Sequence, residues 1–416
     1  MDTRAERFPL FDSLRAIGCL GVIVGHCAAF GDMVSPEAAV KPYVDQIAVV
    51  LTLFFLVSGF LLYRPFVAAR LDGRPRPSLR AYGWRRTLRL IPAYWVALTL
   101  ITIWLGSSPH IVSEPKPTEV FSLEGIFLYY GFAQTYTIDS LSGGLPQAWT
   151  LNVEGLYYLL LPAFVAFMAW WTPRRTGKTT VGRELFAIGL LVLSTYVYIW
   201  IILAAGAGPG TGSLPFLTWL PGFIDHIALG MGLAVLSVAT ARRAGGPTRA
   251  ERVIDRWPGA TWLVALVAFW IVSTQVQGTP ADPVTTADGL LRHALYAVAG
   301  VALVLPAVFG DPQRGLVRRL LANRALVHFG LVSYGVYVWH VAIIVQLDRW
   351  NWGDHVLVHP YLHWMVPVVL LAWLAGSISY YALERPVLSL KRLVPARPAQ
   401  PDQPGAVSAP ARPPAV

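Results

Sequence analysis

Apolar residues along this chain gather in runs of about twenty, separated by polar stretches. A helix of about twenty apolar residues is long enough to cross a hydrocarbon core of ~30 Å. The pattern therefore predicts an all-α fold, a polytopic membrane helical bundle with about ten transmembrane helices. We expect the spans at residues 10–30, 43–63, 89–106, 147–171, 184–205, 217–240, 259–277, 289–309, 326–347 and 361–383.

These spans predict one membrane-embedded domain over residues 1–393. Residues 394–416 are rich in Pro and Ala, and we expect them to form a disordered cytoplasmic tail. The composition supports the membrane class, because 55% of the 416 residues are hydrophobic and only 13% are charged. A soluble domain carries roughly twice that charged fraction, so a soluble multidomain protein is excluded.

The positions of Lys and Arg predict the topology, because these residues collect in cytoplasmic loops. With the N-terminus inside, all but four of the 33 Lys and Arg fall in inner segments; the exceptions are Lys41, Lys116, Arg292 and Arg349. We therefore expect a multi-pass protein of the cell (inner or plasma) membrane with both termini in the cytoplasm. The same asymmetry accounts for the net charge of +10, so the expected partner is the lipid bilayer and not nucleic acid.

The segment Val120–Tyr136 is apolar enough to resemble a further span. If it crossed the membrane, every later loop would change sides and the Arg-rich loops would face outward, at a large cost. We expect instead a re-entrant or interfacial helix inside a long outer loop at residues 107–146.

Ionisable side chains inside a membrane span are costly, so each is a candidate for function. Three arginines lie toward the inner side: Arg15, Arg86 and Arg89. The outer half holds His26, Glu154, Asp225, His226, Arg292, His293 and His340. Because the outer residues come from five helices, we expect them to form one titratable chamber. The basic inner mouth below it suits an anionic donor from the cytoplasm.

Two pairs of these residues have helical spacing. Arg15 and His26 are eleven residues apart, so they share a helix face at a separation of ~16 Å. Arg86 and Arg89 are three residues apart on one face, and guanidinium groups are natural partners of phosphates. The alternatives are interhelical packing for His26 and membrane anchoring for the arginines.

Glu154 is the one acidic residue in the segment PQAWTLNVEGLYYLLLP. A carboxylate in a membrane helix needs a hydrogen-bonding or charged partner. We expect Glu154 to orient His26 or to act as a base itself. A structural link to Arg292 or to another helix is the alternative.

Three further polar residues, in SYGVYVWH, lie close to one face of the ninth span: Ser333, Tyr337 and His340. They are candidates for substrate binding or for interhelical hydrogen bonds. Ser58 and Gly59, in FFLVSGFL, indicate close helix packing. We predict no metal site, because Pro360 interrupts the one metal-like spacing, that of His355, His359 and His363.

Taken together, the segments resemble the acyltransferase 3 family of integral membrane O-acyltransferases. FDSLRAIGCLGVIVGH resembles its R-x10-H helix, and FFLVSGFLL follows at the expected place. RTLRLIPAYW resembles its R-x-x-R motif. QAWTLNVEGLYYLLLP resembles its W-S-L-x-x-E segment, although Thr150 replaces the usual Ser, and SYGVYVWH resembles its late S-Y-x-x-Y-x-x-H segment. The ordered match runs from the first span to the ninth.

The resemblance implies that His26 is catalytic and that the arginine motifs bind the donor. The implied reaction moves an acyl group, which we expect to be acetyl, from cytoplasmic acyl-CoA to a hydroxyl of a carbohydrate, glycolipid or secondary metabolite. Acyl-CoA would be a co-substrate, with no bound cofactor. His26 would act as a general base or hold the acyl group itself, and the sequence leaves both routes open. The alternative is a secondary transporter or exporter that uses intramembrane Asp, Glu and His.

Overall fold

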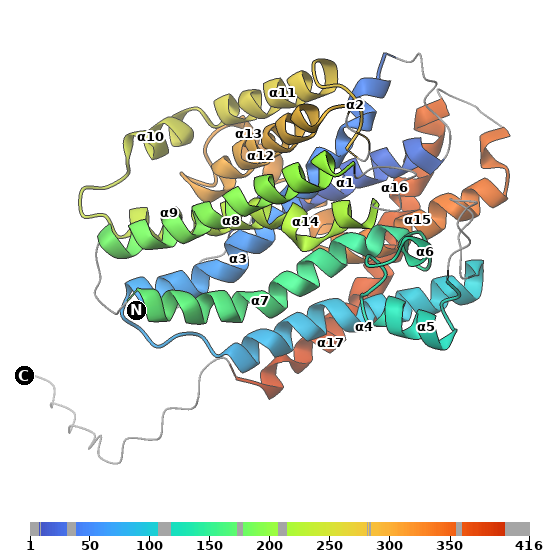
Figure 1. Ribbon diagram of the computed structural model, residues 1–416, viewed down its shortest axis with the longest axis horizontal. Coiled ribbons are helices and arrows are strands. Elements are labelled where there is room, and N and C mark those ends of the chain that lie inside the picture. The colour runs from blue at the N-terminus through green and yellow to red at the C-terminus, as the bar shows by residue number, and fades with distance from the viewer. Residues whose placement is uncertain are drawn as a thin grey trace, which may run out of the picture.

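The computed structural model describes residues 8, 10–30, 39–106, 118–172, 178–206, 214–280, 282, 284–354 and 360–395. Within these ranges the regular structure is helical (Figure 1). The long helices are α1 Leu10–Phe30, α3 Leu51–Leu71, α4 Leu79–Leu105, α7 Trp149–Trp171, α8 Lys178–Ala204, α9 Ile224–Ala241, α11 Pro258–Thr274, α12 Thr286–Val308, α15 Ser333–Arg349 and α16 Pro360–Ser379. The short α-helices are α2 Lys41–Asp45, α5 Leu123–Gly125, α6 Ile138–Leu141, α10 Arg249–Arg256, α13 Leu316–Leu321, α14 Arg324–Leu331 and α17 Arg385–Ser389. Single turns of 3₁₀ or π-helix occupy Ile47–Val50, Ile126–Tyr130, Pro146–Ala148, Leu214–Thr218, Leu220–Gly222, Trp352–Asp354, Tyr380–Glu384 and Leu390–Leu393.

Each predicted span corresponds to a helix or to a bent pair of helices. In the described ranges, eight helices are long and apolar enough to cross a membrane, and ten are if each bent pair counts as one span. The prediction of an all-α, multi-pass membrane bundle is therefore confirmed. One boundary was wrong by about three turns: α4 begins at Leu79, where the Ser78 side chain caps it by accepting from the Ala81 N–H, and not at residue 89.

The ninth span is broken, whereas the sequence predicted one helix over residues 326–347. α14 and α15 meet at 76° around Val332. Gly330 lies so close to Asp12 of α1 that a Cβ at position 330 would overlap the Asp12 carbonyl oxygen. The bend lets α14 lie against α1, while α15 continues along α16.

The segment Val120–Tyr136 contains only single helical turns, α5 and the π-turn Ile126–Tyr130. These turns are too short to cross a membrane, which agrees with the prediction that this segment does not span. Tyr94 and Trp95 of α4 hold the segment by donating to the carbonyls of Tyr129 and Tyr130, at 2.9 and 3.0 Å. The segment therefore packs beside α4.

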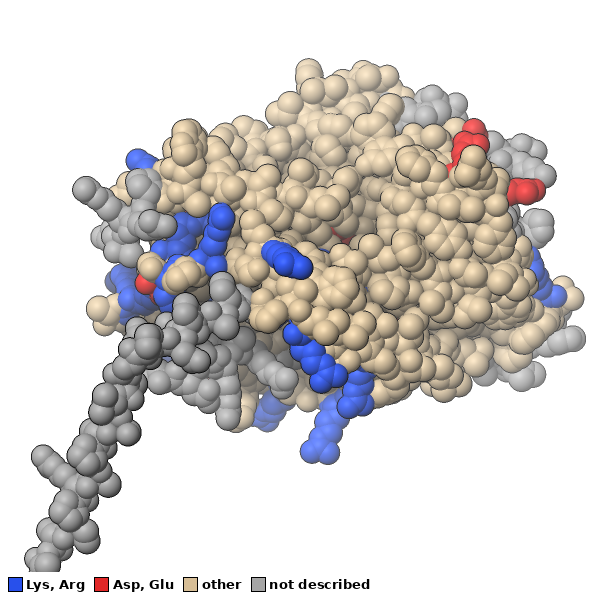
Figure 2. Space-filling view, turned by 90° about the horizontal axis from the view of Figure 1, so that it is seen from below, with Lys and Arg blue, Asp and Glu red and all other residues tan. Residues whose placement is uncertain are grey.

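Charged residues are distributed unevenly along the bundle. α10, with its three arginines, lies at one end, and α2, α5 and α6 lie at the other (Figure 1). On the face shown in Figure 2, the Lys and Arg side chains lie mostly over the left half, and the larger acidic groups lie at the right, with a smaller one among the basic side chains at the left. The orientation predicted from the loops stays a prediction.

The most extensive helix packing joins α3 to α9. A Cβ at Gly59 would overlap the carbonyl oxygen of Ile227, and a Cβ at Gly230 would overlap that of Leu56. Small residues of this kind let membrane helices approach until their backbones touch. The predicted packing role of Gly59 is confirmed, whereas Ser58 beside it faces the interior cavity described below.

The orientation predicts the result of reporter fusions. Fusions after Thr172 and Gly246 should report a cytoplasmic position, and a fusion after Gly278 should report an outer one, because the Arg-rich loops stay inside. The measurement is paired alkaline phosphatase and fluorescent-protein activity in whole cells. An outer signal at both Thr172 and Gly246 would mean that the segment Val120–Tyr136 crosses the membrane.

The α3–α9 contact predicts a strong packing defect. Gly59→Val should destabilise the fold by 1–3 kcal/mol or more, because the added methyl groups meet backbone that cannot move aside. The measurement is thermal unfolding in detergent. Gly189→Val is the matched control, since nothing lies near a Cβ on this exposed residue of α8. Equal melting temperatures for the two variants would contradict the proposed backbone contact.

Candidate active site

A cavity of about 330 Å³ lies inside the bundle where α1, α3, α4, α7 and α15 meet. Its polar lining residues are Arg15, Ser58, Arg86, Arg89, Thr150, Glu154, Tyr158, Ser333, Tyr334 and Tyr337. Six of the eight predicted site residues therefore line one cavity. The other two, His26 and His340, form a separate pair close to Tyr337.

Arginine gives this cavity a basic wall. Arg86 and Arg89 stand one turn apart on α4, and Arg15 comes from α1. The guanidinium carbon of Arg86 lies 5.7 Å from the centroid of the Tyr158 ring, a cation–π contact. The Nε atom of Arg86 is buried and has no hydrogen-bond partner among the described residues. Three arginines and one carboxylate leave a positive excess, which suits an anionic group.

Glu154 has a different partner from the one expected. Ser58 Oγ on α3 donates a hydrogen bond of 2.5 Å to Glu154 Oε1 on α7, across the cavity wall. This bond is the link to another helix that the sequence left open. The link to Arg292 is wrong, because Arg292 donates to Gln46 Oε1 and to two backbone carbonyls. Glu154 therefore presents its carboxylate to the cavity, fixed from the α3 side.

The partner that holds the His26 ring is His340. His26 Nδ1 lies 2.6 Å from His340 Nε2, and the two rings meet edge to edge, with centroids 4.9 Å apart and planes 6° apart. His340 is fully buried, whereas His26 is partly exposed. The sequence placed both histidines in the outer half but did not predict their contact.

Hydrogen bonds assign the tautomers of this pair. His340 Nδ1 lies 2.6 Å from the Tyr337 carbonyl oxygen, which can only accept, so Nδ1 carries the proton. Neutral His340 then has its lone pair on Nε2 and accepts from His26 Nδ1–H. Neutral His26 consequently carries its own lone pair on Nε2, the nitrogen that can act as a base.

Tyr337 ties the histidine pair to α7. Its phenol donates to the carbonyl of Gln147, and Thr150 Oγ1 lies 2.6 Å from the same phenolic oxygen. The Gln147 side chain returns a hydrogen bond of 2.8 Å to the Val338 carbonyl. Thr150, which replaces the expected Ser, therefore contributes a hydroxyl to this contact as Ser would.

One face of α1 links the basic cavity to the histidine pair. Arg15 lines the cavity, and His26 stands three turns further along, at a separation of ~16 Å. Cys19, on the same face between them, approaches the Ser333 carbonyl oxygen with a sulfur–oxygen distance of 3.7 Å. The predicted shared face of Arg15 and His26 therefore lines the cavity at Arg15 and contacts α15 at Cys19 and His26.

The outer ionisable residues do not form the single chamber that the sequence suggested. Asp225 and His226 of α9 and His293 of α12 form a second group, and both histidines line a cavity of about 110 Å³. Leu51 lines both cavities and lies between them. The sequence placed these residues at a similar depth, but depth alone does not separate clusters that lie side by side.

Part of the histidine-rich outer segment lies outside the described residues, namely His355 and His359. The third histidine of that spacing, His363, is described. Its Nε2 lies 2.9 Å from the Trp352 carbonyl oxygen, and its ring stacks on the Trp352 ring. This histidine therefore has a structural partner.

Comparison with known proteins gives one consistent result. The chain is similar to O-acetyltransferase OatA of Staphylococcus aureus (strain NCTC 8325 / PS 47), at 23% identity over 386 residues. It is also similar to a putative O-acetyltransferase of S. aureus strain COL, at 22% identity over 384 residues. Both matches cover 91% of this chain and 57% of the relative, so the chain spans less than two thirds of these curated relatives. No solved structure matches the chain.

The family comparison covers nearly the whole of the described helical bundle. The family profile described as "Acyltransferase domain" matches residues 9–384, a region that includes both cavities and the histidine pair. This chain therefore belongs to the acyltransferase 3 family that its motifs resemble.

Proposed function

We propose that the chain is a membrane O-acyltransferase that moves an acetyl group from cytoplasmic acyl-CoA to a hydroxyl on the outer side. The observation that carries the proposal is the continuous face of α1, with Arg15 in a basic cavity and His26 in a histidine pair. The names of the two relatives, an O-acetyltransferase and a putative O-acetyltransferase, support acetyl as the transferred group. Family membership favours acyl transfer over the transporter alternative.

In this proposal the donor enters from the inner side. Coenzyme A phosphates would bind Arg86 and Arg89, assisted by Arg15, because guanidinium groups bind phosphate oxygens in bidentate geometry. The thioester arm would extend through the cavity toward His26. The acceptor would be a carbohydrate, a glycolipid or a small molecule with a free hydroxyl.

The chemical step uses the lone pair on His26 Nε2. His26 would take the proton of the acceptor hydroxyl while the hydroxyl oxygen attacks the thioester carbonyl carbon. Collapse of the tetrahedral intermediate would break the carbon–sulfur bond, and the thiolate would recover the proton from His26. In the second route, Nε2 itself attacks the thioester carbonyl carbon and expels the coenzyme A thiolate. The acceptor hydroxyl then attacks the acyl-histidine carbonyl carbon, its proton passes to the thiolate, and His26 is released. His340 serves both routes, because it holds the Nδ1 proton and thereby keeps the lone pair on Nε2.

Two arginines test the donor site. Arg86→Gln with Arg89→Gln should weaken acetyl-CoA binding by about tenfold or more for each residue, since a charge-assisted hydrogen bond contributes ~1.5–3 kcal/mol. The measurement is equilibrium binding of labelled acetyl-CoA to purified protein. Arg85→Gln is the control, because Arg85 is exposed and does not line the cavity. An unchanged Kd in the double variant would limit Arg86 and Arg89 to membrane anchoring.

The histidine pair gives the sharpest test of the mechanism. His26→Gln should bind acetyl-CoA normally and lose 10²–10⁴-fold in transfer rate, the usual contribution of a general base. His340→Gln should lower the transfer rate roughly 10²-fold, because the His26 ring is then no longer held in position. The measurement is O-acetyl product in surface glycans and lipids by mass spectrometry, with acetyl-CoA binding measured in parallel.

His363→Gln is the control for this test, because this buried histidine lies outside the site and should leave transfer nearly unchanged. If His26→Gln keeps more than a tenth of the wild-type transfer rate, the substitution raises the activation free energy of transfer by less than ~1.4 kcal/mol. Such a result would exclude His26 as the base and direct attention to Glu154.

A further inference from the structure

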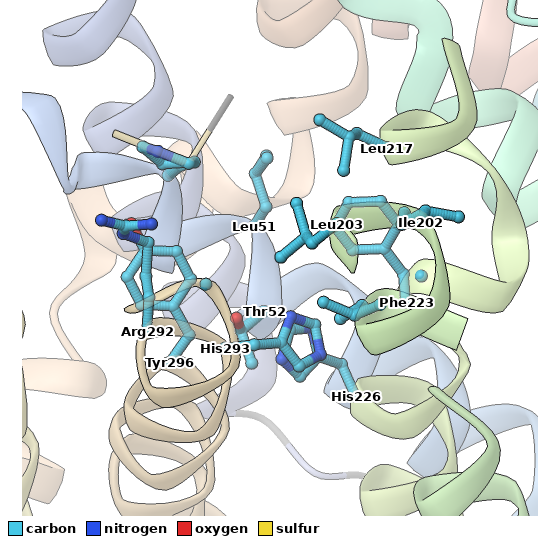
Figure 3. Close-up of a pocket in the computed structure, with 15 residues that line it drawn as sticks. Leu51, Thr52, Ile202, Leu203, Leu217, Phe223, His226, Arg292, His293 and Tyr296 are labelled. Atoms are coloured by element: carbon cyan, nitrogen blue, oxygen red, sulfur yellow. The ribbon is translucent and has the colours of Figure 1, made fainter. Parts of the chain in front are cut away.

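The second cavity, of about 110 Å³, has no part in the proposed transfer. It lies among α8, α9, α12 and the start of α3 (Figure 3). Most of its lining is apolar, including Leu51, Ile202 and Leu203. Its polar lining is confined to Thr52, His226, Arg292, His293 and Tyr296. The two histidines come from different helices and lie together on one side (Figure 3).

These two histidines share a carboxylate. His293 Nε2 lies 2.9 Å from Asp225 Oδ2, and His226 Nε2 lies 3.7 Å from the same oxygen. The rings stack with centroids 4.5 Å apart. One oxygen of Asp225 and one nitrogen of each histidine all lie within 4.8 Å of one another. This spacing is the one expected of side chains that can converge on a single ion.

The group also contains unpartnered polar atoms. Asp225 is fully buried and His226 is 2% exposed. Among the described residues, both ring nitrogens of His226 and Oδ1 of Asp225 lack a hydrogen-bond partner. Buried polar groups are nearly always paired, and each unpaired one costs about 1–3 kcal/mol. Asp225 Oδ2 already has a hydrogen-bond partner in His293, whereas neither ring nitrogen of His226 has one, so His226 is the residue that calls for a ligand.

We propose that Asp225, His226 and His293 bind a divalent transition-metal ion of the zinc class. Two imidazole nitrogens and one carboxylate oxygen are a donor set that Zn²⁺ accepts, at ~2.0–2.2 Å from each atom. Small shifts of the side chains bring three atoms this close to one ion. The carboxylate offsets part of the metal charge, and the cavity leaves room for a water or hydroxyl as the fourth ligand.

The one cation in the cavity lining does not oppose this site. Arg292 donates to Gln46 Oε1 at 3.1 Å and to the carbonyls of Gln277 and Gly278 at 2.6 and 2.9 Å. These acceptors hold its guanidinium across the cavity from the two imidazoles (Figure 3). The metal would join the first turn of α9 to α12 and would do so independently of the proposed acyl transfer.

Zn²⁺ binding by the purified full chain tests the proposal. After treatment with chelator, the wild-type protein is titrated with Zn²⁺, and bound metal is counted by mass spectrometry after gel filtration. We expect saturation near one ion per chain. We also expect binding to be weakened at least tenfold in Asp225→Asn and in His226→Gln. His363→Gln is the matched control and should bind Zn²⁺ as the wild type does.

X-ray absorption of the Zn²⁺-loaded wild type gives a test that does not depend on any variant folding. The first coordination shell of the Zn²⁺ should contain nitrogen and oxygen atoms and no sulfur. The spectrum should also show the scattering expected of imidazole rings. The proposal is overturned if the wild type binds no Zn²⁺ saturably, or if both site variants bind Zn²⁺ as tightly as the wild type. It is also overturned if His363→Gln loses Zn²⁺ binding, or if the coordination shell contains no imidazole.

Discussion

Tyr337 makes hydrogen bonds through both its phenol and its backbone carbonyl. The phenol holds Thr150 in the first turn of α7 and Gln147 in the 3₁₀ turn just before it, and so fixes the wall that carries Glu154. The carbonyl accepts from His340, which in turn holds His26. An unpaired polar group in the membrane interior costs several kcal/mol. Breaking these hydrogen bonds is therefore unfavourable, and they fix the positions of α1, α7 and α15 relative to one another.

Motifs on a single helix were readable from the sequence. Arg86 and Arg89 share a face because helical spacing requires it, and the structure brings them together with Arg15 in one cavity. The ten apolar runs also predicted the bundle, since the hydrocarbon thickness sets the length of every span. In these cases a local property of the chain determines the outcome.

Contacts between helices were not readable in this way. The pairing of His26 with His340, and of Glu154 with Ser58, depends on how each helix is rotated about its axis, and hydropathy does not encode that rotation. The break between α14 and α15 lies inside a continuous apolar run. It depends on a backbone contact between Gly330 and α1, which no local pattern reveals.

The hydrogen-bonded chain from His26 through His340 ends at a peptide carbonyl, and this ending limits proton movement. An amide oxygen accepts a hydrogen bond but does not take up a proton near neutral pH. His340 therefore cannot pass a proton onward through Nδ1, and any proton that His26 gains must leave again on the His26 side. The pair can exchange protons with a reactant without conducting them along this chain, so it does not provide a route for dissipating the transmembrane proton gradient.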